Sequence, residues 1–260
     1  MAEHRGKFVD GCEQKHGIDR KLSEDLFNNI EKFAGYGFNK SHSAAYAVIA
    51  YQTAWLKAHF PVELMAALLS SENNSADAVV KFISECQANN IKILPPDINS
   101  SDKFFSVTDQ EIRYGMSAVK NVGDAAIDSI IETRDKYGRY VSIFDFCEKV
   151  DLRKVNKRVV ESLIQCGAFD STGAKRSQLM AAVESSLEHG QRVQKEKNDP
   201  QMGLFDMIED KASISINRPE LIEMDEWEPK ELLDMEKEVL GFYVSGHPLD
   251  KYKKLLKKLT

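Results

Sequence analysis

Hydrophobic residues follow one another along residues 44–60 without settling on one side of a helix. They include Tyr46, Val48, Ile49, Tyr51, Trp55 and Leu56. A helix that is apolar nearly all round is usually buried by neighbours on several sides. We therefore predict a buried helix over residues 44–60. Because proline disfavours helical geometry in the residue before it, Pro61 should end or kink this helix at Phe60, and a second helix should begin at Val62.

Polar residues lead into this predicted helix at Asn39, Lys40, Ser41 and His42. Either Ser41 or Ser43 suits the N-cap position. Free backbone N–H groups and the helix dipole favour an anion at such a place, and Lys40 adds a cation. An ordinary capped helix with a solvated lysine accounts for the same pattern, and spacing alone favours that simpler interpretation.

The periodicity changes from helical to strand-like and back after residue 75. Residues 76–88 have apolar side chains at helical spacing, which predicts an amphipathic helix. Two consecutive prolines then break any helix, and short strands are expected near residues 91–93, 105–107 and 111–114. Helical patterns return afterwards, so we predict a mainly α fold with a short β-strand region.

Residues 116–134 predict a helix, a tight turn and a second helix. In the turn, Val119 and Val122 should hold the hairpin to the core, while Gly123 allows a left-handed or crowded backbone. The next helix would begin near Asp124 and present N–H groups to a DNA phosphate, with Lys120 adding charge. Such binding would be independent of sequence and sensitive to salt. The predicted contacts are Lys120, Asn121, Val122, Gly123 and Asp124. An ordinary pair of helices joined at a glycine remains the alternative.

A second helix pair can be drawn over residues 144–169. Residues 149–158 contain five bases and one acid. Asn156 and Lys157 stand where a glycine would be expected, and asparagine tolerates left-handed geometry, so the turn is possible. The predicted DNA-binding residues of this copy are Lys154, Asn156, Lys157 and Arg158.

One more helix is predicted over residues 175–194, followed by a polar linker. Gln201 and two large apolar residues, Leu204 and Phe205, come directly after it. Exposed apolar residues of this size are costly, so they should bury either in a partner or in their own domain. The pattern alone does not choose between the two.

The charge distribution excludes a generally basic protein. The net charge is −6, so any contact with nucleic acid must come from a local patch. Residues 206–238 carry twelve acids against four bases, and the last ten residues carry five lysines. Blocks like these are typical of solvated or tail-like segments. The four cysteines have no metal-ligand spacing, and no signal peptide or membrane span is apparent. A cytoplasmic protein without a metal site is expected.

Two long stretches, FNKSHSAAYA and YQTAWLKAHFPVELMAALLSSE, resemble the fingers region of the C-family of bacterial replicative DNA polymerases. The resemblance implies that the incoming nucleoside triphosphate is contacted by Lys40, Ser41, His42 and Tyr46. It also implies a tandem helix-hairpin-helix domain that binds double-stranded DNA. The pentapeptide that begins at Gln201 resembles a sliding-clamp-binding motif, in which the clamp contacts would be Gln201, Leu204 and Phe205.

The same resemblance predicts how the chain is divided. Residues 1–90 would belong to the fingers, 91–114 to a connection, 115–190 to the hairpin domain, and 191–210 to a linker with the clamp motif. Residues 211–260 would lead towards an OB-fold domain. The carboxylates that hold the catalytic Mg ions would lie in a palm domain before Met1, so this chain alone is predicted to be inactive and to contain no catalytic residue.

Two other functions fit parts of the pattern. A stand-alone DNA-binding adaptor of the repair type would use the hairpins and give residues 39–46 no nucleotide role. A protein-interaction module would bind a partner through residues 200–208 and use the hairpins only as structure, which the net charge of −6 leaves open.

Overall fold

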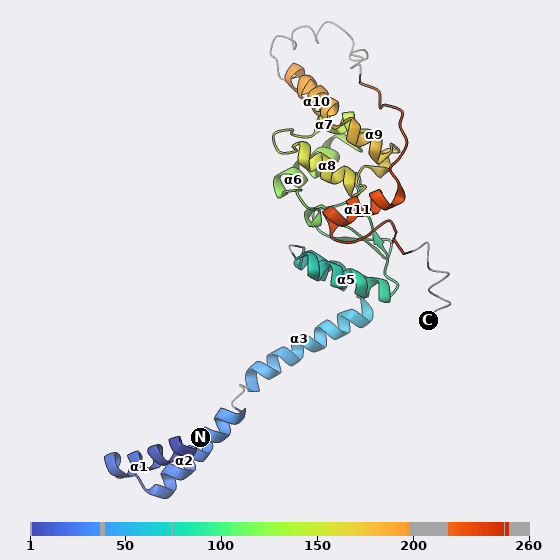
Figure 1. Ribbon diagram of the computed structural model, residues 1–260. Helices are drawn as coiled ribbons and strands as arrows, with labels where there is room; N and C mark the ends of the chain where they lie inside the picture. The colour runs from blue at the N-terminus through green and yellow to red at the C-terminus, as the bar shows by residue number, and fades with distance from the viewer. Residues whose placement is uncertain (1, 37–39, 74, 198–217, 247, 250–260) are drawn as a thin grey trace. The chain divides into compact units, whose positions relative to one another are not determined.

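The protein is described by a computed structural model that covers residues 2–36, 40–73, 75–197, 218–246 and 248–249 (Figure 1). Its contacts define two compact units, which divide between His59 and Phe60. The resemblance assigns residues 1–90 to the fingers, which stays a prediction. By their contacts, the two helices after Phe60 group with the strands and helices that follow them.

The described residues of the first unit form three helices: α1 (Ala2–His16), α2 (Arg20–Tyr36) and α3 (Lys40–His59). Helices α1 and α2 pack together around the buried side chains of Val9 and Phe27. The ring centroids of Phe8 and Phe27 are 5.6 Å apart. Helix α2 begins directly after Asp19, whose carboxylate accepts the backbone N–H of Leu22 at 3.2 Å and so caps the helix.

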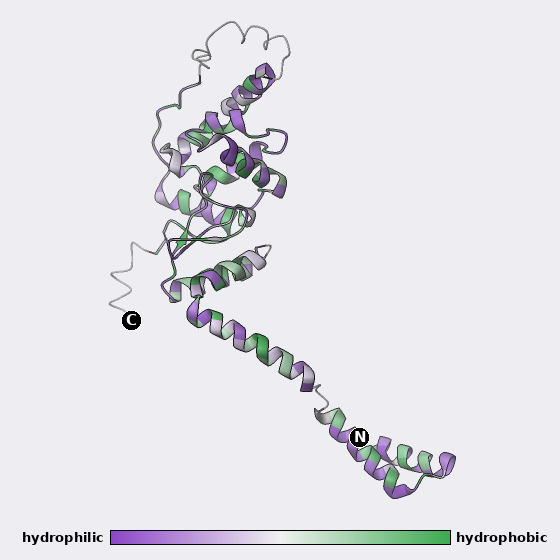
Figure 2. Cartoon of the chain, turned by 180° about the vertical axis from the view of Figure 1, so that it is seen from behind, coloured by the Kyte–Doolittle hydropathy of each residue, from purple (hydrophilic) through white to green (hydrophobic). Residues whose placement is uncertain are grey.

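The prediction that α3 is buried is wrong for this chain. No residue of α3 is buried, and Tyr51 is 72% exposed, although hydrophobic residues occur along the helix (Figure 2). The all-round apolar pattern requires cover that the described residues do not supply. The helix also begins at Lys40, so Ser41 and Ser43 lie inside it and neither is the N-cap. The predicted break is confirmed, because α3 ends at His59.

The second unit opens with two helices and a small sheet. Helix α4 (Pro61–Ser71) has proline at its first position, and α5 (Ala76–Ala88) has the predicted bounds. The strands are β1 (Ile93–Leu94), β2 (Ser106–Thr108) and β3 (Glu111–Arg113), in the order β1-β3-β2. Strand β3 is parallel to β1 and antiparallel to β2. Both residues of the β2–β3 turn, Asp109 and Gln110, have positive φ, which matches the twist of a two-residue hairpin.

The remaining elements of the described chain are helical. They are η1 (Met116–Ala118), α6 (Asp124–Tyr137), α7 (Ile143–Lys149), α8 (Lys157–Gln165), η2 (Asp170–Thr172), α9 (Arg176–Ala181), α10 (Val183–Lys197) and α11 (Pro229–Leu240). Their apolar side chains form one core with those of α4, α5 and the strands, and the fully buried Phe146 packs edge-on against Tyr140 and Phe169. The prediction of a mainly α fold with a short β-strand region is confirmed.

Two predicted helices differ in the structure. The first arm over residues 116–134 is only the single 3-10 turn η1, and the predicted helix over residues 175–194 is two helices that break at Ala182. A break of one residue hardly changes the spacing of apolar positions, so periodicity did not reveal it.

Residues 191–197 of the predicted linker are helical in the structure. Helix α10 continues to Lys197, and its Val193 is buried. The Gln194 amide donates to the carbonyl oxygens of Cys147 at 2.9 Å and Val150 at 2.7 Å. A Cβ on Gly190 would lie 2.5 Å from the Cys147 oxygen, so glycine is what lets α10 approach α7 this closely. These contacts hold residues 191–197 in the domain.

The acidic segment also packs against the domain, which corrects the expectation of a tail. The carboxylate of Glu226 accepts the N–H groups of Arg176 at 2.7 Å and Ser177 at 3.0 Å, at the start of α9. Glu236 in α11 accepts from the buried Arg176 guanidinium at 2.9 Å. Val239 and Leu240 of α11 join the core. The described acids here are therefore used as a helix cap and an ion-pair partner, and charge counting cannot detect either use.

Candidate nucleic-acid interface

The first hairpin joins η1 to α6 through residues 119–123. Val119 and Val122 are buried, as predicted, and fix the turn to the core. The backbone N–H of Lys120 donates to the carbonyl oxygen of Val239 in α11 at 2.9 Å. The turn is therefore fixed by two buried valines and by a hydrogen bond to α11. The sequence did not indicate the contact with α11.

Left-handed geometry in this turn falls on Asn121 and not on Gly123. Asn121 has φ 66°, whereas Gly123 is extended, with φ −83° and ψ 160°. A Cβ on Gly123 would meet nothing within 4 Å, so its backbone is neither left-handed nor crowded, and that prediction is wrong. Gly123 is instead the N-cap of α6, and the cap has no side chain. The first N–H groups of a helix lack intrahelical partners, so this one ends in an open donor surface.

The negative charge of Asp124 lies beside these N–H donors, and Lys103 partly neutralises it. Asp124 is the first residue of α6, and its carboxylate is 3.3 Å from the Nζ of Lys103. The same Nζ is 3.5 Å from the carboxylate of Asp128. Desolvation acts to lower the pKa of Lys103, but the hydrogen bond and the charge of Asp124, together with Asp128, raise it on balance. Lys103 therefore stays charged and reduces the repulsion that Asp124 would exert on a phosphate.

The second hairpin joins α7 to α8 and has a different N-cap. Asn156 is extended, with φ −88° and ψ 173°, so the left-handed turn proposed for it is wrong. Its side-chain oxygen accepts the backbone N–H of Val159 at 3.1 Å. One of the donors that a phosphate would use is thus already bonded within the protein.

The predicted basic side chains of this hairpin lie on its surface. Lys154, Lys157 and Arg158 are exposed, and the Nζ of Lys157 is 3.6 Å from the carboxylate of Glu184 in α10. Lys120 of the first hairpin is also exposed. Exposed lysines and arginines at a helix start provide the charge that phosphate binding requires.

The two hairpins exchange equivalent contacts. The Asn121 amide in the first turn donates to the Ser162 hydroxyl at 3.1 Å, and the backbone N–H of Asp151 in the second turn donates to the Ser129 hydroxyl at 3.0 Å. Each serine is buried and is the sixth residue of the second helix of its hairpin, α8 or α6. These two hydrogen bonds fix the starts of α6 and α8 relative to each other. The sequence could not predict them, because each joins residues that are far apart in the chain.

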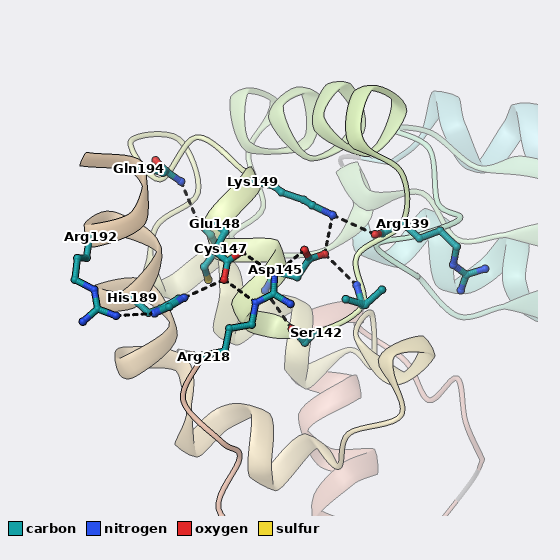
Figure 3. A network of polar contacts seen from close by, with 11 residues as sticks. Arg139, Ser142, Asp145, Cys147, Glu148, Lys149, His189, Arg192, Gln194 and Arg218 are labelled. Atoms are coloured by element: carbon teal, nitrogen blue, oxygen red, sulfur yellow. Dashed lines mark hydrogen bonds and ion pairs between the residues drawn. The ribbon is translucent and has the colours of Figure 1, made fainter. Parts of the chain in front are cut away.

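Helix α7 is held by a network of charges that sequence reasoning missed (Figure 3). Arg218, in the chain before α11, donates to both carboxylate oxygens of Glu148 at 2.8 Å and to Asp145 at 3.2 Å. The Nε2 of His189 is 2.9 Å from Glu148, and its Nδ1 is 3.2 Å from the Arg192 guanidinium. Since arginine can only donate, the Nδ1 of His189 accepts from Arg192, and its Nε2–H donates to Glu148. Burial alone would raise the pKa of Glu148, but Arg218 and His189 lower it on balance.

The predicted nucleotide-binding residues lie at the start of α3. Lys40, Ser41 and His42 form its first turn, and all three are exposed. The ring centroids of His42 and Tyr46 are 4.3 Å apart, so the structure brings these two side chains together one turn apart on the helix. The role of the four residues stays a prediction.

The remaining predictions concern the clamp contacts, the lack of a metal site and the cysteines. Gln201, Leu204 and Phe205 lie outside the described residues. Among the residues that the structure covers, no three His, Cys, Asp or Glu side chains gather as a metal site. Cys86, Cys147 and Cys166 are buried free thiols, and burial raises the pKa of Cys86 to about 11. Within the described ranges, no helix has both the length and the apolar character to cross a membrane.

Comparison with known proteins assigns a family first to the hairpin region and then to the whole chain. Residues 90–179 match the helix-hairpin-helix motif family, which places this part of the chain in that class. The entire chain is 46% identical to DNA polymerase III subunit alpha of Neisseria meningitidis serogroup B and 43% identical to that of Vibrio cholerae serotype O1. It is 42% identical over 99% of its length to that of Escherichia coli K12.

The chain belongs to the DNA polymerase III alpha family. It spans 22% of the length of each of these three relatives.

Proposed function

We propose that this chain binds double-stranded DNA through its two hairpins as part of a replicative DNA polymerase. The observation that carries the proposal is the open N-terminus of α6 at Gly123, which the buried Val119 and Val122 hold in place. Free N–H groups and the positive end of the helix dipole favour a phosphate at this position. Lys120 beside it adds a full positive charge.

The second hairpin contributes mainly charge. Asn156 already bonds one N–H of α8, so Lys154, Lys157 and Arg158 supply most of the attraction there. Contacts of both kinds reach the DNA backbone and not the base edges, so binding is independent of sequence and falls steeply with salt.

The exposed helix α3 supports a role in a larger enzyme. An apolar helix with no buried residue requires further protein around it, and in the complete polymerase the fingers and palm would provide this cover. There Lys40, Ser41 and His42 contact the triphosphate of the incoming nucleotide, and Tyr46 stacks on its base. The Mg ions and the carboxylates that bind them would belong to the palm of that enzyme.

The segment with Gln201, Leu204 and Phe205 tethers the polymerase to the sliding clamp in the cytoplasm. Support comes from the residue types, since two adjacent apolar side chains can fill a pocket while the glutamine amide bonds at its rim. Binding of the clamp to the chain and to a variant with Leu204→Ala and Phe205→Ala tests this role directly.

Duplex binding by the 260-residue chain is the deciding experiment. Fluorescence anisotropy with a labelled blunt duplex would be recorded over a salt series, for the wild type and for a variant with Gly123→Asp and Lys120→Ala. Binding that falls with salt and is weakened in the variant supports the proposal. Clamp binding without any DNA affinity at low salt would overturn it and favour a protein-interaction module.

A further inference from the structure

An open groove of about 920 Å3 lies beside the hairpins and is not explained by them. Its walls come from the second half of α6, the turn between α7 and α8, and the second half of α10. Because these segments are far apart in the chain, no sequence pattern indicated that they share a site.

The groove is positively charged. Five bases line it against two acids, Glu132 and Asp151; the bases are Lys136, Lys149, Arg153, Lys154 and Lys195. Two of these bases are paired with acids, since the Arg153 guanidinium bonds Asp151 at 2.9 Å and the Nζ of Lys149 is 2.8 Å from Asp145, outside the groove.

Three exposed lysines, Lys136, Lys154 and Lys195, then face the single acid Glu132. The C-termini of α6 and α7 each add about half a negative charge, which is too little to cancel them. The groove therefore favours an anion with several charges.

An aromatic side chain lies in the same groove. Tyr137, the last residue of α6, is 56% exposed, and the Nζ of Lys136 is 4.9 Å from its ring centroid. Phosphate contact by the hairpins needs no aromatic surface. A basic groove with an exposed aromatic face is instead typical of single-stranded nucleic acid, whose phosphates follow the charges while a base stacks on the ring.

We propose that this groove binds single-stranded DNA next to the duplex held by the hairpins. Lys154 lines the groove and lies two residues before Asn156, the N-cap of the second hairpin, so the two surfaces are continuous. Lys136, Lys195 and Tyr137 bind the strand and are not needed for the duplex. The proposal rests on the proposed function only in that the hairpins bring the DNA to this side of the domain.

Binding of a labelled oligothymidine of about 12 nucleotides tests the groove, because such a strand lies within the usual site size and forms no duplex. The 260-residue chain would be compared with a variant carrying Lys136→Gln and Lys195→Gln, and with Tyr137→Leu. Removing two phosphate contacts should reduce the slope of log affinity against log salt by about 1.4. Losing the stacking surface should weaken binding by roughly tenfold. Lys230→Gln on the exposed face of α11 is the matched control and should change neither value.

The same variants measured with a blunt duplex separate this proposal from the hairpin proposal. Loss of oligothymidine binding with duplex affinity kept supports the groove. Unchanged oligothymidine affinity in both groove variants, with circular dichroism showing that they fold, overturns it even if the hairpins bind duplex. A parallel loss for duplex and single strand also overturns it, because the groove would then belong to the duplex site. Failure of Gly123→Asp to affect duplex binding would count against the hairpins alone.

Discussion

The two hairpins have nearly the same backbone at the start of their second helix but offer different chemistry. Gly123 and Asn156 are both extended N-caps, with ψ of 160° and 173°. The glycine leaves the helix terminus open, whereas the asparagine bonds the N–H of Val159. The position of a helix start is therefore fixed by the fold, while its capacity for phosphate is set by one side chain.

The hairpins also differ in how they are supported. The first has only the 3-10 turn η1 before its turn, and α11 bonds it through the carbonyl oxygen of Val239. The second has a full helix, α7, which Arg218 and His189 hold through Glu148. In both cases the support comes from residues far along the chain. Stability of the second hairpin should thus depend on charge and pH, and that of the first on packing.

The largest difference is expected from adding a negative charge to each cap. Gly123→Asp should lower duplex affinity by roughly 30- to 100-fold, because the carboxylate occupies the free N–H groups and repels a phosphate. Aspartate is a good N-cap and a Cβ has space here, so the fold should be kept. Asn156→Asp should cost less than about fivefold, since that cap is already occupied.

Anisotropy with one labelled duplex at a single salt concentration measures both variants. Gly123→Ser is the matched control, because it caps the helix without charge and should lie between the wild type and Gly123→Asp. Equal losses for Gly123→Asp and Asn156→Asp would contradict the proposed difference between the hairpins.

The next effect concerns the charged support of α7. Glu148→Gln should destabilise the chain by about 2 kcal/mol in urea unfolding, because Arg218 and the buried His189 lose a charged acceptor. The folded-state pKa of Glu148 is lowered from 4.5, so its contribution is present above pH 4.5 and is lost as the pH falls through the lower value.

The difference in stability between the wild type and Glu148→Gln should therefore shrink on acidification below pH 4.5. Glu161→Gln in α8 would serve as a control for loss of one acid. If the difference in unfolding free energy stayed constant down to acid pH, protonation of Glu148 would not be coupled to unfolding.

Sequence patterns predicted what depends on neighbours in the chain. The helix over residues 76–88, the break at Pro61 and the buried Val119 and Val122 follow from periodicity, proline geometry and a short motif. These features require only local information, since the same few residues carry both the signal and the structure.

Features that join distant segments could not be predicted in this way. The capping of α9 by Glu226 and the contact of Arg218 with Glu148 link residues that are 50 and 70 positions apart. Glu226 and Arg218 both lie in the acidic segment, which we predicted to be tail-like from its charge. The groove beside the hairpins is a third example, because its lysines become neighbours only after α10 packs on α7.

A smaller effect should separate the two reciprocal contacts. Ser129→Ala removes the acceptor of the Asp151 N–H in the second turn, and Ser162→Ala removes the acceptor of the Asn121 amide in the first. We expect a loss of about 1–1.5 kcal/mol for Ser129→Ala and about 0.5–1 kcal/mol for Ser162→Ala, because the exposed Asn121 can turn to water. Urea unfolding measures both, with the exposed Ser84→Ala in α5 as control. A larger loss for Ser162→Ala would reverse this ranking.

The smallest expected change converts the second hairpin into a copy of the first. Asn156→Gly keeps the extended backbone and removes the side-chain acceptor of the Val159 N–H, which then bonds only the backbone oxygen of residue 156, at a cost of only a few tenths of a kcal/mol in stability. Duplex affinity should then rise by about threefold, because the helix start without its side-chain cap can add a weak phosphate contact. Asn156→Ala removes the same side-chain acceptor but should destabilise the chain by about 1 kcal/mol, which separates the gain in binding from the loss of the cap. If Asn156→Gly left the affinity unchanged while Gly123→Asp abolished it, only the first hairpin would touch the DNA backbone through its helix terminus, and the basic side chains of the second would act at longer range.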